Sequence, residues 1–217
     1  MELRDYFRIL RRRGWIIIVM IAITAASAYG FSKLQTPVHK ASVNVSINPA
    51  RADFGLTQSA KILLRNYVAI VHSETWAGDV IQRLSLDLTP GQLKGNVTVA
   101  SDDSRMLIQI DVKDGDAGQA ARIANDWAQL LVEWRQSENA QQRKEDQVNA
   151  YQIDPATAGL FSPKTKINTA AGGILGLLLA GVIIFFLEWV ESGVIRSTDD
   201  VERILGLTVL GAVPPTD

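Results

Sequence analysis

The segment Trp15 to Leu34, WIIIVMIAITAASAYGFSKL, decides the architecture of this chain. It carries no charge before Lys33, and about 20 residues at about 1.5 Å per residue are enough to cross a hydrocarbon layer about 30 Å thick. A second segment, Ala170 to Leu187, reads AAGGILGLLLAGVIIFFL and is also uncharged. Because backbone groups in lipid must find partners within their own segment, both are predicted to be membrane-spanning helices.

The distribution of basic residues predicts how the chain is oriented. Cytoplasmic flanks are enriched in Lys and Arg, and the first span usually dominates. The far side of the first span offers only Lys33 and Lys40, whereas Lys164 and Lys166 beside the second span favour the opposite orientation weakly. Five arginines precede the first span: Arg4, Arg8, Arg11, Arg12 and Arg13. We therefore predict that both termini lie in the cytoplasm and that the middle of the chain lies outside it.

A cleavable signal peptide is the alternative interpretation of the first segment. Basic residues, an apolar stretch and the small residues Ala26-Ser27-Ala28 are the parts of such a peptide, and cleavage would leave a single span. Two features favour a retained anchor. Among the arginines, apolar residues recur at helical spacing at Leu3, Tyr6, Phe7 and Leu10, and the apolar stretch continues past Ala28 to Phe31.

Composition excludes several classes of protein. The 217 residues are 47% hydrophobic and 21% charged, with a net charge of -1. A chain this apolar is not a disordered one, and without a basic stripe it does not resemble a nucleic-acid binder. The absence of cysteine removes disulfide frameworks, thiol nucleophiles and cysteine-based zinc sites.

Small residues recur four apart in both predicted spans. Such stripes let helix backbones approach closely in lipid, although Gly and Ala are also simply frequent in membrane helices. We predict contact faces, within one protomer or between protomers, at Ala22, Ala26, Gly30, Gly172, Gly176 and Ala180.

The segment between the spans is predicted to be a small α/β domain, so the chain belongs to the α+β class. Alternating apolar residues over 41–47 indicate a strand, and apolar spacing of three and four over 57–72 and 73–84 indicates helices. Thr89-Pro90-Gly91-Gln92 has the form of a capping box and begins a short helix. Segments 96–101 and 105–112 alternate around a turn at Asp102-Asp103-Ser104 and are predicted to pair as strands.

The last helix of this domain begins near Asp116. Its apolar residues recur at three and four through Trp134, which predicts packing on the sheet. From Gln136 to Gln147 the apolar face disappears. We expect either a frayed end or a helix that projects from the domain and is supported by neighbouring copies.

Candidate catalytic and metal sites are weak. Asp114-Gly115-Asp116 has the DxD form of some glycosyltransferases, but Asp and Gly are also the expected turn and N-cap residues between a strand and a helix. His39 and His72 are isolated in sequence and form no ligand set. We therefore predict no enzyme activity, no metal and no cofactor.

The order of these features resembles the chain-length determinant, or polysaccharide co-polymerase, family of bacterial inner membranes. A basic start, a first span, a strand and helix module, a long helix and a Gly-rich second span follow one another over nearly the whole chain. Pro155, Pro163 and Lys164 correspond to the family's proline motif before the second span, here in a sparse form. The short outer domain favours the small branch of the family, whose members are associated with a separate tyrosine kinase.

The tail STDDVERILGLTVLGAVP, Ser197 to Pro214, resembles the family's kinase-contacting segment. No phosphate-binding loop of the form GxxxxGK[ST] is present, so a kinase would have to be a separate chain. The resemblance implies that contacts with it are made by Asp199, Asp200, Val201, Ile204, Leu205, Leu207, Leu210, Gly211 and Pro214.

The resemblance implies a non-enzymatic scaffold that regulates the length and export of a capsular, exo- or O-antigen polysaccharide. Its partners would be further copies in a ring, the polymerase with its nascent glycan, the membrane lipid and the kinase. A membrane-anchored sensor or adaptor that binds an extracytoplasmic ligand remains the alternative. The expected divisions are a cytoplasmic N-terminus (1–14), the first span (15–34), the outer domain (35–166), the second span (167–189) and the cytoplasmic tail (190–217).

Overall fold

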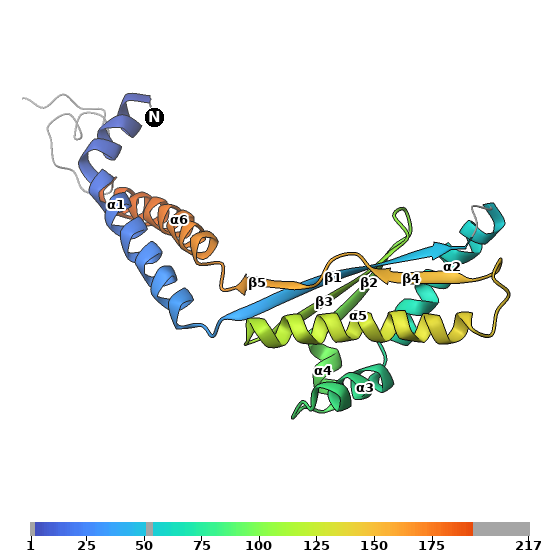
Figure 1. The fold of residues 1–217 in the computed structure, drawn as a ribbon. Helices are drawn as coiled ribbons and strands as arrows, with labels where there is room; N and C mark the ends of the chain where they lie inside the picture. The colour runs from blue at the N-terminus through green and yellow to red at the C-terminus, as the bar shows by residue number, and fades with distance from the viewer. Residues whose placement is uncertain (1–2, 51–53, 193–217) are drawn as a thin grey trace, which may run out of the picture. The chain divides into compact units, whose positions relative to one another are not determined.

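The structure is a computed structural model that describes residues 3–50 and 54–192. Contacts between residues divide the chain into two compact units. One unit contains the helices at the two ends of the described chain, and the other spans Gln35–Lys164. The chain is thus a mixed helix and sheet protein in which two apolar helices flank a strand-rich domain, as the sequence predicts (Figure 1).

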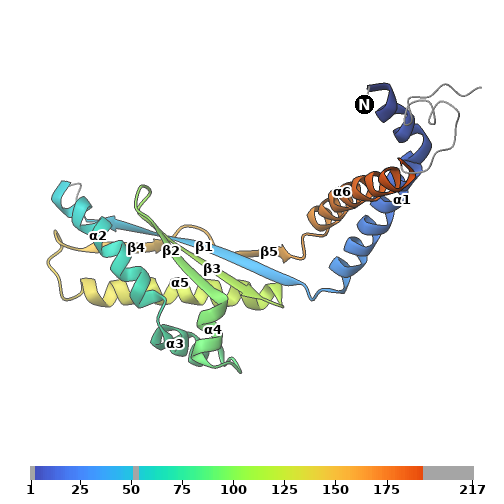
Figure 2. The ribbon, with the colours of Figure 1, turned by 180° about the vertical axis from the view of Figure 1, so that it is seen from behind.

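The first unit is a helical hairpin. Helix α1 (Leu3–Leu34) and helix α6 (Thr165–Ser192) lie side by side (Figures 1 and 2). Within them, Arg11–Leu34 and Thr165–Glu191 are long and apolar enough to cross a membrane, with 24 and 27 residues. At about 1.5 Å per residue both exceed the thickness of about 30 Å that a bilayer requires.

The second unit is built on an antiparallel sheet in the order β2-β3-β1-β4, with β5 also pairing with β1. The long central strand β1 has β3 on one edge, and β4 and β5 follow one another along its other edge. The strands are β1 (Val38–Pro49), β2 (Val97–Asp102), β3 (Leu107–Asp114), β4 (Val148–Gln152) and β5 (Thr157–Ser162). Strands β1, β2 and β3 confirm the three predicted strands, whereas β4 and β5 were not predicted.

Four helices complete the domain, and two of them begin at the caps that the sequence predicts, Thr89 and Asp116. They are α2 (Phe54–Val71), α3 (Glu74–Leu84), α4 (Pro90–Asn96) and α5 (Ala117–Asn139). Ser73 accepts a hydrogen bond from the backbone N–H of Trp76, and Thr89 and Gln92 form the complete capping box. Asp116 accepts the backbone N–H of Gln119 at 2.6 Å. Local side-chain chemistry therefore fixes where three of these helices begin.

The core lies between one face of the sheet and the helices α2 and α5. Helix α5 runs along the sheet, and α3 packs against both α4 and α5 (Figures 1 and 2). Ala41, Val43 and Val45 of β1 are buried beneath them. Trp127 of α5 is fully buried, and its indole N–H donates to the carbonyl of Val71 at 3.0 Å, which ties α5 to the end of α2.

The expectation of a projecting or frayed end after Gln136 is wrong. Helix α5 ends at Asn139, and residues 140–147 turn the chain back into β4. Arg135 and Asn139 are buried, and both donate hydrogen bonds to the carbonyl of Val148, at 3.3 and 3.0 Å. The side-chain oxygen of Asn139 accepts the N–H of Val148 at 3.1 Å. Polar residues therefore continue the packed face where the apolar pattern stops.

Candidate functional site

The contact between the two apolar helices is close enough to bring backbone against side chain. A Cβ atom added to Gly172 would lie 2.6 Å from the Cβ of Ala28 and 2.9 Å from the carbonyl oxygen of Thr24. One added to Gly176 would overlap the hydroxyl of Thr24 and lie 2.8 Å from the carbonyl oxygen of Met20. Glycine is therefore required at both positions for this packing, and Ala180 continues the face as a fully buried residue.

The α1 side of this contact is made by other residues than the predicted stripe. Met20, Thr24 and Ala28 are partly buried, whereas Ala22, Ala26 and Gly30 are exposed. A Cβ atom added to Gly30 would meet nothing within 4 Å. The structure thus brings Gly172, Gly176 and Ala180 into the hairpin contact and places the stripe of α1 outside it.

Thr24 lies in the middle of the contact without leaving its hydroxyl unpaired. The hydroxyl donates to the carbonyl of Met20, one turn earlier, at 2.8 Å. This intrahelical bond satisfies the polar group locally, as is common for Thr in membrane helices.

Polar residues hold the two ends of the hairpin. At one end the buried Ser32 pairs with the hydroxyl of Thr165 at 3.2 Å and accepts a hydrogen bond from Asn168 at 3.1 Å. At the other end Arg13, which is only 7% exposed, forms an ion pair with Glu191 at 2.7 Å. These pairs show that the helices are antiparallel, and they fix the register in which the glycines meet α1.

The three residues of the predicted proline motif do not form one cluster. Pro155 lies in the connection between β4 and β5, whereas Pro163 and Lys164 follow β5 immediately before α6. The ammonium group of Lys164 lies 5.7 Å from the ring centre of Phe161. Phe161 was not singled out from the sequence, although Lys164 follows it by three residues, because the approach of Lys40 and Lys113 to its ring arises only in the folded sheet.

The predicted kinase-contacting residues, from Asp199 to Pro214, lie outside the described residues. They stay an expectation from the resemblance.

Both carboxylates of the DxD sequence accept hydrogen bonds from nearby backbone N–H groups. Asp114 accepts the N–H of Asp116 at 2.8 Å, and Asp116 caps α5. His39 and His72 each pair with a backbone carbonyl, of Gly115 and Val97, at 3.0 and 3.1 Å. Within residues 3–50 and 54–192, no group of three or more His, Cys, Asp or Glu side chains is placed to hold a metal ion. These residues therefore have structural roles in the turn and the strand ends.

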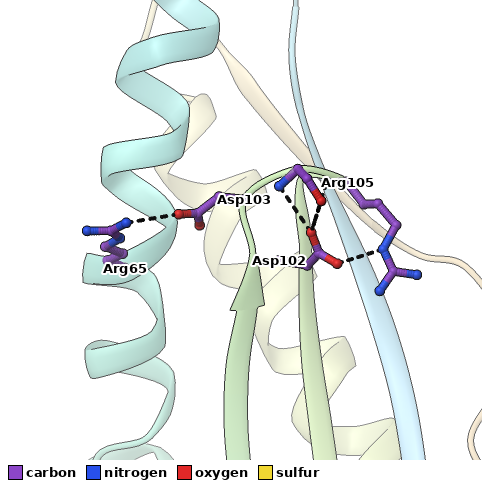
Figure 3. A network of polar contacts seen from close by, with 5 residues as sticks. Arg65, Asp102, Asp103 and Arg105 are labelled. Carbon is purple, nitrogen blue, oxygen red and sulfur yellow. Dashed lines mark hydrogen bonds and ion pairs between the residues drawn. The ribbon is translucent and has the colours of Figure 1, made fainter.

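The turn between β2 and β3 carries a network of hydrogen bonds and ion pairs (Figure 3). Asp102 accepts the backbone N–H of Arg105 at 3.0 Å and its side chain at 2.6 Å. Hydrogen bonds from Ser104 and Arg105 hold the pKa of Asp102 far below its usual range. Asp103 reaches across to Arg65 of α2 at 3.2 Å. An open hollow of about 450 Å³ lies over this turn, and the ion pairs of Asp102 with Arg105 and of Asp103 with Arg65 fix the turn and tie it to α2.

Comparison with known proteins decides the family. The family model described as Wzz, chain length determinant protein, matches residues 1–114, which is more than half of the chain. The chain belongs to the chain length determinant family. The match covers the first span, the central strand and the sheet through β3, so it includes the elements on which the domain is built.

Curated relatives extend this similarity over almost the full length. The chain is 28% identical to the capsular polysaccharide biosynthesis protein CpsC of Streptococcus pneumoniae, over 98% of this chain and 94% of that protein. It is 26% identical to the capsular polysaccharide type 8 biosynthesis protein cap8A of Staphylococcus aureus, over 98% and 96%. It is 28% identical to the probable capsular polysaccharide biosynthesis protein YwqC of Bacillus subtilis, over 98% and 87%. These lengths place the chain in the small, two-span branch of the chain length determinant family.

Family and structure together identify the chain as a bacterial plasma-membrane protein. The family is one of membrane proteins, and the two apolar helices are long enough to span. Membership supports a role in controlling the chain length of a polysaccharide.

Proposed function

We propose that this chain is a non-enzymatic polysaccharide co-polymerase that sets the length and export of a capsular or related surface polysaccharide. The match to the chain length determinant family over residues 1–114 is the observation that carries this proposal. The names of the three relatives reported above refer to capsular polysaccharide biosynthesis, which favours a capsular polymer. A regulator without a catalytic site has to act by binding and placing the polymerase and its growing glycan.

Two spans of opposite direction support a defined topology. The chain places its N-terminus (1–14) and tail (190–217) in the cytoplasm and its sheet domain outside. The excess of arginines before Trp15 supports this orientation. Because the hairpin is antiparallel, the two ends of the sheet domain return to the same membrane surface.

Several copies assemble side by side into a ring. The exposed stripe of Ala22, Ala26 and Gly30 gives α1 a second face on which a neighbouring copy can approach closely, since its first face is covered by α6. Such an assembly would enclose or line a path for the glycan. Particle mass in lipid discs tests it, and a single copy per disc at all protein concentrations would reject the ring.

The tail engages a separate cytoplasmic tyrosine kinase. Its apolar residues, among them Val201, Ile204 and Leu210, are interspersed with Asp199 and Asp200 and lack the basic face of a helix that lies on lipid. Phosphorylation of the kinase would then control assembly of the complex.

The experiment is truncation after Arg196 in the source organism. We expect a polymer of altered length and a kinase whose phosphorylation changes, because the kinase loses its docking segment. If polymer length and kinase phosphorylation both stay as in the wild type, the tail has no such role. If deletion of the whole gene also leaves polymer length unchanged, the chain is instead a sensor or adaptor without a polymer role.

A further inference from the structure

Three lysines surround one aromatic ring at the end of the sheet that precedes α6. The ammonium groups of Lys113, Lys164 and Lys40 lie 4.8, 5.7 and 5.9 Å from the ring centre of Phe161. We call these four residues the lysine patch. They come from β1, β3, β5 and the residue immediately before α6, so the fold itself assembles the patch.

The position of Phe161 follows from an irregularity in the sheet. Strand β5 pairs Leu160 with His39 and Ser162 with Val38, which leaves Phe161 as an extra residue between two pairs. Such bulges redirect a side chain away from the regular alternation. Here the ring remains 37% exposed beside Leu160, which is 62% exposed.

The lysines of the patch are placed unfavourably for the isolated domain. Lys40 and Lys113 lie directly opposite each other in the β1–β3 register, and like charges in such pairs repel. Asp111 compensates one of them, since it lies 2.7 Å from Lys40. Within the described chain no carboxylate lies within ion-pair distance of Lys113 or Lys164. The patch therefore carries an excess of positive charge that an external anion would neutralise.

The surrounding groups confirm that Asp111 is already engaged. Burial alone would raise the pKa of Asp111, but hydrogen bonds from Lys40, Ser42 and Gln109 outweigh this and lower it. The carboxylate is thus ionised at neutral pH and shared by three donors. It leaves the other two ammonium groups available to a ligand.

The covalent chain limits how far the patch can lie from the start of a spanning helix. Lys164 is bonded directly to Thr165, the first residue of α6, and Phe161 precedes that helix by four residues. Four extended residues reach at most about 14 Å. An anion at this distance from a spanning helix is most abundant as the phosphate of a lipid headgroup.

We propose that the lysine patch docks on the anionic headgroups of membrane phospholipids, with Phe161 and Leu160 reaching into the interface. Ammonium groups pair with the lipid phosphates, and the exposed aromatic and aliphatic side chains suit the headgroup region. The contact holds the β1–β5 end of the domain at the bilayer, whichever side of the membrane the domain occupies. It needs no polymer, polymerase or kinase, so it stands apart from the proposed function.

The absence of cysteine from the chain permits a direct test. A single cysteine replaces Leu160 in the full chain, is labelled with a polarity-sensitive fluorophore, and is reconstituted into lipid discs of phosphatidylcholine with or without phosphatidylglycerol. Phosphatidylglycerol should blue-shift the label and protect it from acrylamide. The matched control is Gln142→Cys in the turn beyond the other end of β1, a strand of twelve residues or about 40 Å. Equal acrylamide quenching of the Leu160 label in both kinds of disc would overturn the proposal.

Charge variants separate this contact from a general attraction of the domain to anionic lipid. Lys40→Gln, Lys113→Gln and Lys164→Gln together should abolish the protection, because each lysine near an anionic surface changes the docking equilibrium by roughly five-fold. Lys61→Gln, Lys94→Gln and Lys144→Gln remove the same charge from other parts of the domain and should leave the protection intact. Equal loss in both triple variants would contradict the proposal. So would protection by soluble polyphosphate in phosphatidylcholine discs without any effect of phosphatidylglycerol, since the ligand would then be a soluble anion.

Discussion

Two helix pairs of this protein pack in opposite ways. Between α1 and α6 the contact is made at Gly172 and Gly176, which have no side chain and so let α1 approach the α6 backbone closely. Between α2 and α5 it is made by large rings, since Tyr67 meets Trp134 edge to face at 5.3 Å and Trp127 is fully buried. The α1–α6 pair thus packs through residues without side chains, whereas the α2–α5 pair packs through large buried side chains.

The difference in packing follows from the surroundings of each helix pair, which are lipid for α1 and α6 and water for α2 and α5. Lipid tails are as apolar as the helices, so burial in lipid gives little driving force and close backbone packing has to stabilise the hairpin. In water the aromatic side chains of the domain gain the hydrophobic free energy of burial. The same substitution should therefore have unequal consequences in the two regions.

The largest expected effect is Trp127→Ala in the domain. Loss of a fully buried indole should lower the free energy of unfolding by about 3–5 kcal/mol. Urea denaturation followed by far-UV circular dichroism measures this change. The counterpart is Trp15→Ala in α1, where Trp15 is 64% exposed in the structure. That variant should leave the urea midpoint of the domain unchanged. If both variants lowered the free energy of unfolding equally, the proposed difference between the two regions would be wrong.

The complementary change in the hairpin is Gly176→Leu. The added side chain overlaps Thr24 and should push the helices apart, at a cost of about 1–3 kcal/mol. Spin labels on cysteines at Ile23 and Leu175, both exposed, report the separation by pulsed electron resonance. Gly181→Leu is the matched control, since a Cβ atom there meets nothing within 4 Å. If both variants gave the wild-type separation, the glycine contact would not determine the packing.

An effect of about the same size is expected where polar residues continue the packed face of α5. Asn139→Ala leaves the backbone N–H of Val148 without its acceptor, at a cost of about 1–3 kcal/mol of unfolding free energy. Amide hydrogen exchange should speed up locally in β4. Gln141, which is exposed in the same turn, provides the control variant Gln141→Ala. An unchanged exchange rate in Asn139→Ala would argue that the hydrogen bonds of Asn139 do not stabilise β4.

The smallest expected effect is a gain in stability from Asp126→Asn in α5. Burial, opposed by Arg83 and reinforced by Glu133, raises the pKa of Asp126 above its ordinary value of 3.8. As the pH rises through 3.8, the carboxyl of Asp126 ionises in the unfolded chain before it ionises in the folded one. Above pH 3.8 the ionised Asp126 therefore lowers the free energy of unfolding. Asn should therefore stabilise the domain by a few tenths of a kcal/mol at pH 7, a gain reduced by solvent screening. The gain should vanish below pH 3.8, and a loss of stability at pH 7 would contradict this sign.

The starts of α4 and α5 were predictable from sequence because capping is local. Thr89 and Asp116 each accept a backbone N–H from the residue three positions ahead, so the local sequence is enough to identify them. The short strands β4 and β5 were not predictable in the same way. They have five and six residues and lie at one edge of the sheet, with little apolar alternation.

The buried polar residues and the lysine patch depend on partners far along the chain. Arg135 and Asn139 are buried because Val148 supplies hydrogen bonds, and hydrophobic periodicity does not detect burial that is achieved by pairing. Lys40 meets Lys113 only through the register of β1 and β3. Likewise, the stripe of small residues in α1 defines a face, but spacing does not say which neighbour that face meets.

The length distribution of the surface polysaccharide tests the central claim most directly. Polymer is extracted from a strain that lacks the chain and from strains that express the wild type, Gly176→Leu or Gly181→Leu, and is resolved by gel electrophoresis. We predict that the wild type and Gly181→Leu give one common modal length, and that Gly176→Leu shifts toward the pattern of the strain without the chain. The same distribution with and without the chain would contradict a role in setting polymer length.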